Sequence, residues 1–98
     1  MTEAKEEIIR SISSYIQENG DNYGDWAFGV CRDQQELLPY LRYAEGHLWR
    51  YKYTGNPKIA REILDYFVTE MGADCQTKYP RRNDEVIYLY KKIKHLIH

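Results

Sequence analysis

The chain has 98 residues, a length typical of one small domain that buries roughly 65% of its unfolded surface. Its 43% hydrophobic and 30% charged residues are ordinary for a globular protein and exclude a disordered or fibrous chain. The net charge is −1, with four Lys/Arg and nine Asp/Glu in residues 1–49 (net −5) and ten and six in residues 50–98 (net +4). We interpret this asymmetry as a solvated surface pattern, although it would also orient a charged partner.

The cysteine count and the hydropathy pattern bear on the cellular setting. Cys31 and Cys75 are too few for a disulfide framework or a zinc cage. There is no basic leader followed by an apolar stretch, and no long apolar run. We therefore expect a cytoplasmic protein that has no membrane span, no cofactor and no metal site.

The first segment with a regular pattern is a helix over residues 3–18. Acidic residues near its start favour the positive end of the helix dipole, and an Asn-Gly pair follows its end. Its apolar residues recur three and four apart, on one face: Ile8, Ile9, Ile12, Tyr15 and Ile16. This face predicts that the helix covers one side of a sheet.

Two strands with a helix between them follow. Alternating large apolar residues predict a strand over residues 26–31. A capping-box pattern then opens a helix over residues 33–46, in which Pro39 marks a kink or a new start. Three aromatic residues alternate with basic ones in the second strand, residues 48–53.

The strongest helix signal of the chain lies at residues 56–72. Asn56 suits the N-cap, Pro57 suits the first helical position, and Gly72 can adopt the left-handed conformation that ends a helix. The apolar face of this helix consists of Ile59, Ala60, Ile63, Leu64, Phe67 and Met71. We expect it to pack on the sheet.

Residues 85–91 complete the pattern as a third strand. Both of its faces are apolar, which predicts a central position in the sheet. The fold prediction is therefore α+β in a single domain of residues 1–98, with a three-stranded antiparallel sheet flanked by three helices in the order αβαβαβ. The expected core residues are Ile12, Phe28, Leu41, Trp49, Ile63, Phe67 and Tyr88.

Few residues have the spacing of catalytic or metal-binding groups. The three histidines lack the i, i+4 spacing with an acidic partner that a helical metal site uses. Cys31 lies next to Arg32, and a neighbouring cation favours the thiolate. We favour the alternative, a structural thiol that is partly buried. We predict no catalytic residue from these patterns.

Basic and aromatic residues are interleaved in the second half of the chain. Cations beside stackable rings are what single-stranded nucleic acid engages. The candidate cations are Arg50, Lys52, Arg81 and Arg82, with Lys91 and Lys92 further along, and the candidate aromatic surface is Tyr51, Tyr53, Tyr79 and Tyr90. The alternative, which we favour for a slightly acidic chain, is that the tyrosines pack in the sheet and the cations surround them.

Several segments together resemble small bacterial proteins related to the GIY-YIG nuclease fold. They are WAFGVCRD at residues 26–33, an aromatic strand LWRYKY, and then AREILDYF, MGAD and VIYLYKK. The resemblance covers most of residues 23–92. It implies a three-stranded antiparallel sheet flanked by helices.

The active members of that family use a Tyr in each motif of the opening hairpin, an Arg on the next helix and a metal-binding Glu on a later one. This chain keeps only a glycine of the second motif, has Glu36-Leu37 where the Arg is expected, and has Leu64 where the Glu is expected. The resemblance therefore implies a scaffold without the catalytic set. We expect a non-catalytic interaction module that binds a protein or a second copy of itself. The alternatives are single-stranded nucleic-acid binding, or a residual metal-dependent nuclease that uses Glu62 and a Tyr.

Overall fold

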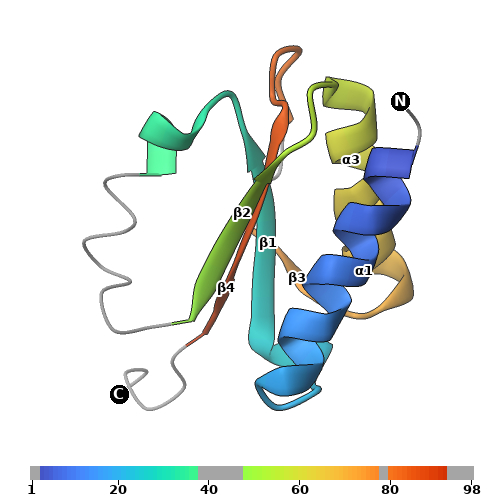
Figure 1. Ribbon diagram of the computed structural model, residues 1–98. Coiled ribbons are helices and arrows are strands. Elements are labelled where there is room, and N and C mark those ends of the chain that lie inside the picture. The colour runs from blue at the N-terminus through green and yellow to red at the C-terminus, as the bar shows by residue number, and fades with distance from the viewer. Residues whose placement is uncertain (1–2, 38–47, 78–79, 93–98) are drawn as a thin grey trace, which may run out of the picture.

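The computed structural model describes residues 3–37, 48–77 and 80–92 and has an α+β architecture (Figure 1). Some of the predicted features lie wholly or partly outside these ranges. Of the helix predicted over residues 33–46, the described part is a short 3-10 turn, η2 (Gln34–Leu37), and the rest lies outside the described residues, as does Tyr79.

Helix α1 spans Glu3–Glu18, the bounds that the sequence predicted. Its apolar face is buried against the sheet, with Ile12 and Ile16 almost fully inaccessible. The chain leaves the helix through Gly20, whose φ of 115° lies in the region that glycine adopts without strain. None of the helices among the described residues has the length and apolar character needed to cross a membrane.

The sheet has four strands, in the spatial order β2-β4-β1-β3. Their bounds are Trp26–Cys31 for β1, Trp49–Tyr53 for β2, Asp74–Cys75 for β3 and Val86–Lys91 for β4. β4 lies between β1 and β2 and is antiparallel to both, whereas β3 runs parallel to β1. The predicted central position of the last strand is therefore confirmed.

The predicted three-stranded antiparallel sheet with three flanking helices is wrong, because the sheet is four-stranded and mixed. β3 is only two residues long and polar, and it lies in a segment that carries no strand pattern. Thr77 extends its pairing with β1, because the Thr77 hydroxyl accepts the Val30 N–H (3.0 Å) and donates to the Val30 carbonyl (3.2 Å). Two α-helices, α1 and α3, occur in the described part of the chain.

Helix α3 spans Pro57–Asp65 and continues as a π-helical segment, η3 (Tyr66–Glu70). The Asn56 side chain accepts the Lys58 N–H at 2.8 Å, so the predicted N-cap is confirmed, with Pro57 at the first helical position. Beyond η3, Gly72 has a φ of +84°, the left-handed conformation predicted for it.

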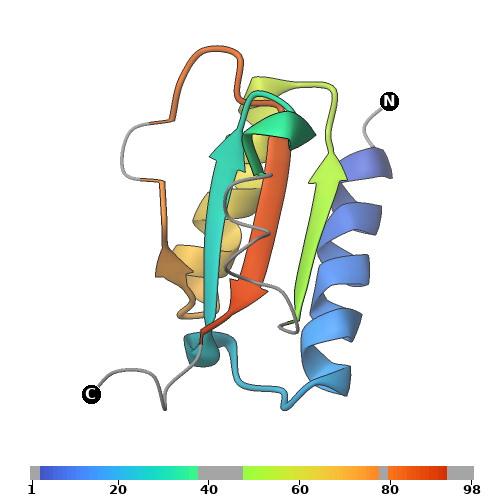
Figure 2. The same cartoon turned by 90° about the vertical axis from the view of Figure 1, so that its left-hand side faces the viewer.

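Helices α1 and α3 cover one face of the sheet, and η2 lies over the other (Figures 1 and 2). We call the face that carries α1 and α3 the helix face and the opposite one the outer face. The core lies on the helix face and includes Trp26, Phe28, Val30, Ile63, Leu64, Phe67, Ile87 and Leu89. A smaller buried cluster of Cys31, Leu37 and Val86 lies on the outer face.

Four of the seven predicted core residues, Ile12, Phe28, Ile63 and Phe67, are fully buried. Trp49 and Tyr88 are only partly buried. Both belong to the outer face, over which the described part of the chain places only η2. Leu41 lies outside the described residues.

Phe67 is the side chain on which the helix-to-sheet contact is centred. Its ring stacks on Phe28 of β1 at 4.5 Å and contacts Tyr66 edge-on at 5.1 Å. We expect Phe67→Ala to lower the free energy of unfolding by ~3–5 kcal/mol in urea denaturation, because it empties a fully buried site. The control Lys58→Ala, at an exposed position of the same helix, should change it by less than about 0.5 kcal/mol. An equal midpoint for Phe67→Ala and the wild type would contradict this packing.

Candidate binding surface on the outer face

The outer face carries aromatic side chains from two neighbouring strands. Arg50 of β2 places its guanidinium 4.2 Å from the centre of the Tyr15 ring on α1, so Arg50 points to the helix face. Side chains alternate along a strand, and the residues on either side of Arg50 therefore point outward. The aromatic residues of the outer face are Trp49, Tyr51 and Tyr53 from β2 with Tyr88 and Tyr90 from β4.

The strand register brings these rings into rows. Trp49 pairs with Tyr90 and Tyr51 pairs with Tyr88 across the β2–β4 ladder. The Trp49 and Tyr51 rings also stack on each other along β2, with centres 5.8 Å apart and planes 12° from parallel. Tyr53 completes the row with 65% of its surface exposed, more than any other large hydrophobic residue in the described part of the chain.

The Tyr88 side chain lies over β1 at Gly29, the residue of that strand that has no side chain. A Cβ at Gly29 would lie 2.4 Å from the Tyr88 hydroxyl oxygen and 2.7 Å from Thr77 Oγ1, so only glycine leaves room for both. Tyr90 reaches further along the sheet and donates a hydrogen bond to Gln76 Oε1 at 2.9 Å. These two tyrosines form the floor of the outer face, whereas the β2 rings form its edge.

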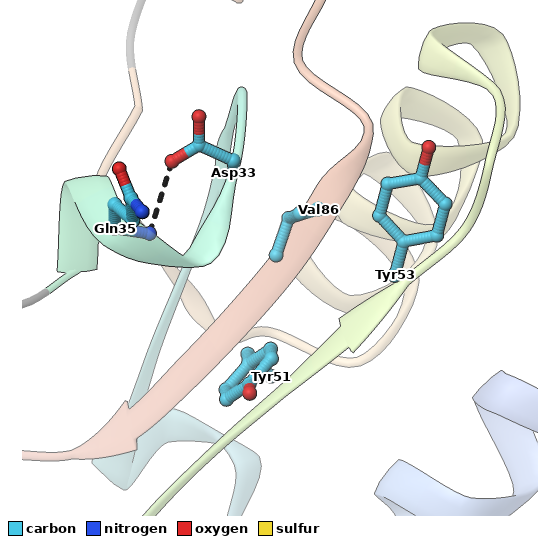
Figure 3. Close-up of a pocket in the computed structure, with 5 residues that line it drawn as sticks. All are labelled: Asp33, Gln35, Tyr51, Tyr53 and Val86. Atoms are coloured by element: carbon cyan, nitrogen blue, oxygen red, sulfur yellow. Dashed lines mark hydrogen bonds between the residues drawn. The ribbon is translucent and has the colours of Figure 1, made fainter.

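A pocket of about 380 Å³ opens between β2 and the turn that precedes η2 (Figure 3). Tyr51 and Tyr53 line it from β2, Asp33 from the turn, Gln35 from η2 and Val86 from β4. Asp33 accepts the Gln35 N–H at 2.9 Å, which fixes the turn. The pocket therefore combines two aromatic rings with a carboxylate and an amide.

Tyr53, which lines this pocket, also forms a hydrogen bond through its hydroxyl. It donates to the Glu85 carboxylate at 3.2 Å. This hydrogen bond and the charge of Glu85 raise the pKa of Tyr53 above its ordinary value. The hydroxyl therefore remains a neutral donor and acceptor, suited to polar contacts at an exposed aromatic surface.

An ion cluster ties η2 to the loop before β4. Arg81 donates to Glu36 of η2 and, through Nε, to the buried carboxylate of Asp84 at 3.1 Å. The Arg81 N–H donates to the same Asp84 side chain at 2.7 Å. The hydrogen bond from Arg81 lowers the pKa of Glu36, and the two carboxylates raise the pKa of Arg81. This cluster positions the turn that forms one wall of the pocket.

Cys31 is buried beside this cluster, as a structural thiol would be. Burial, followed by the charges of Glu36, Asp84 and Asp33, raises the pKa of Cys31 to about 12. The adjacent Arg32 points elsewhere and pairs with Asp33 at 3.7 Å. In the described ranges 3–37, 48–77 and 80–92, no three His, Cys, Asp or Glu side chains are grouped so as to hold a metal ion.

The predicted nucleic-acid contacts do not form one patch. Arg50 and Lys52 lie on the helix face of β2, opposite to Tyr51 and Tyr53. Arg81 is held by Glu36 and Asp84, and Arg82 is exposed in the turn that follows. The predicted rings Tyr51, Tyr53 and Tyr90 do share the outer face.

Five residues of this surface were missing from the predicted site, among them Val86 of β4. Trp49 and Tyr88 could have been assigned to this face from the two-residue alternation of β2 and β4, which is visible in the sequence. Asp33 and Gln35 have no such signal, because only the fold of the chain brings their turn beside β2. Comparison with protein-family models, curated proteins and solved structures found no match to this chain.

The ion cluster predicts a pH dependence of stability. The pKa of Glu36 is below 4.5 in the folded state, so as pH falls the unfolded state takes up this proton first. The contribution of Glu36 is therefore present above about pH 4.5 and is lost as pH falls through its folded pKa. In urea denaturation between pH 6 and 3, we expect Glu36→Gln to lose less stability on acidification than the wild type. Glu70→Gln, at an exposed carboxylate outside the cluster, should follow the wild-type profile, and a similar profile for Glu36→Gln would contradict the assignment.

The close approach of Tyr88 to Gly29 gives a second prediction. Gly29→Ala should lower the free energy of unfolding by roughly 1–3 kcal/mol, because the added Cβ displaces Tyr88 and Thr77. Combining it with Tyr88→Ala should be less destabilising than the sum of the two single changes, since the second change removes one of the clashes. Gly24→Ala is the matched control, because its Cβ would meet nothing closer than 3.4 Å. Strict additivity in urea denaturation would rule out the contact.

Proposed function

We propose that this chain is a non-catalytic binding module, and that its partner is a protein that contacts the outer face along β2. The observation that supports this most is the row of Trp49, Tyr51 and Tyr53 on the edge strand of the sheet. Rings of this kind supply a large contact area at a low cost in side-chain entropy, and protein interfaces are enriched in them.

The positions that the GIY-YIG resemblance points to support a non-catalytic role. Leu64, at the place of the metal-binding Glu, is buried in the core. Glu62, the carboxylate of the residual-nuclease alternative, lies on α3 and pairs with Lys5 of α1 at 3.2 Å. It is therefore on the helix side of the sheet, whereas the β2 tyrosines are on the outer face. Hydrolysis of a phosphodiester needs a metal anchor and a nucleophile activator at one place.

Charge favours protein over single-stranded nucleic acid as the partner. The β2 cations Arg50 and Lys52 lie on the helix face, so a strand stacked on the outer rings would have its phosphates remote from them. The pocket beside those rings presents the Asp33 carboxylate, which repels phosphate.

Site-specific photocrosslinking tests this proposal. A photoreactive phenylalanine analogue at Tyr53 should capture a partner in extracts of cells that express the protein. The same analogue at Lys58, exposed on α3 on the helix face, should not. The adduct should be destroyed by protease and survive nuclease.

Two outcomes would contradict the proposal. A Tyr53 adduct that is destroyed by nuclease would support the nucleic-acid alternative. Equal adducts at both positions, or none at either, would mean that the outer face is not a specific binding surface. An adduct with the mass of two chains would identify the partner as a second copy.

A further inference from the structure

β2 is an edge strand with a defined set of outward-directed backbone groups. In the described part of the chain β4 pairs with one side of β2, and no strand pairs with the other. The Lys91 N–H donates to the Leu48 carbonyl and the Thr54 N–H donates to the Glu85 carbonyl, both at 2.9 Å. Backbone groups alternate in an antiparallel ladder, so those of residues 50 and 52 also face β4. Those of residues 49, 51 and 53 are directed away from it.

The two faces of this edge differ sharply in chemistry. On the outer face it presents the aromatic side chains of Trp49, Tyr51 and Tyr53. On the helix face it presents Arg50 and Lys52, both exposed. A strand added to this edge would place its own alternate residues next to each set, with Cβ atoms ~4.5–5.5 Å apart.

Charge excludes a second copy of this chain from the edge. Two β2 strands related by a two-fold axis pair antiparallel, with their helix faces on the same side. If Tyr51 of one copy lies opposite Tyr51 of the other, each Arg50 lies opposite a Lys52. If the pairing is shifted by two residues, Arg50 lies opposite Arg50, or Lys52 opposite Lys52. Like charges directly opposite each other destabilise a strand pair, and cations on an edge are a known protection against self-association.

We propose that the β2 edge takes up one extended segment of the partner protein as an added antiparallel strand, and that this segment alternates acidic with apolar residues. Its apolar residues lie opposite Trp49, Tyr51 and Tyr53, and its acidic residues lie opposite Arg50 and Lys52. Antiparallel pairing is favoured because it is slightly more stable per residue than parallel pairing. This inference rests on the proposed function and specifies the chemistry of its partner.

The probe is a peptide of sequence Val-Glu-Val-Glu-Val, acetylated and amidated, titrated into the labelled full-length protein and followed by NMR. In antiparallel register each Val faces one aromatic residue and each Glu faces one cation. We expect saturable shifts at the β2 amides. The peptide with Lys in place of Glu should bind about fivefold to thirtyfold more weakly, because two attractive pairs become repulsive.

Charge reversal on the protein is the matched control. Arg50→Glu combined with Lys52→Glu should reverse the preference, so that the Lys peptide binds more tightly than the Glu peptide. Arg10→Glu combined with Lys58→Glu, both at exposed helix positions, should keep the wild-type preference. A preference that does not follow the β2 charges would overturn the assignment.

N-methylation of the peptide separates strand addition from side-chain contact alone. In the proposed register the Val N–H groups face β2, and the Glu N–H groups point away from it. Methylating the Val nitrogens should abolish binding, whereas methylating the Glu nitrogens should leave it. Any other pattern contradicts antiparallel pairing at this edge.

The photocrosslink distinguishes the failure of this inference from the failure of the proposed function. If no peptide shifts the β2 amides at millimolar concentration while Tyr53 still captures a protein, the partner uses the outer face without adding a strand. If both experiments fail, β2 is not a binding element.

Discussion

The fold depends on the pairing of β4 with two strands that precede it in the sequence. β1 and β2 do not pair with each other, and β4 is inserted between them. Without β4, no strand pairing connects β2 to β1 and β3. The strand suits this position because Ile87 and Leu89 are buried in the core, while Val86, Tyr88 and Tyr90 pack on the other face.

This arrangement also creates the candidate binding surface. Because β4 occupies the centre, β2 is left at the edge of the sheet, with aromatic residues on one face and cations on the other. The opposite edge is protected differently, by the two-residue strand β3 and by Thr77, whose hydroxyl pairs with both backbone groups of Val30. The two edges are therefore unequal, and β2 is the one with the longer strand and an exposed aromatic ring, that of Tyr53.

Local signals in the sequence were sufficient for the elements that depend on local physics. The bounds of α1 and β1, the Asn56 cap and the central place of β4 each follow from periodicity, capping or apolar faces within a few residues. The features that escaped prediction depend on distant contacts. β3 is held by the Thr77–Val30 hydrogen bonds, and Arg81 meets Glu36 from 45 positions away. The pocket beside Tyr53 depends on the same long-range contact.

The ten tyrosines of the chain show why residue type alone does not identify a binding site. Tyr15 packs edge-on against Trp26 and lies under Arg50, so it serves the helix face. Tyr88 fills the space above Gly29. Tyr53 is chemically the same side chain, yet it is mostly exposed and its hydroxyl donates to Glu85. Exposure, and not residue type, therefore favours Tyr53 of β2 for the proposed binding role.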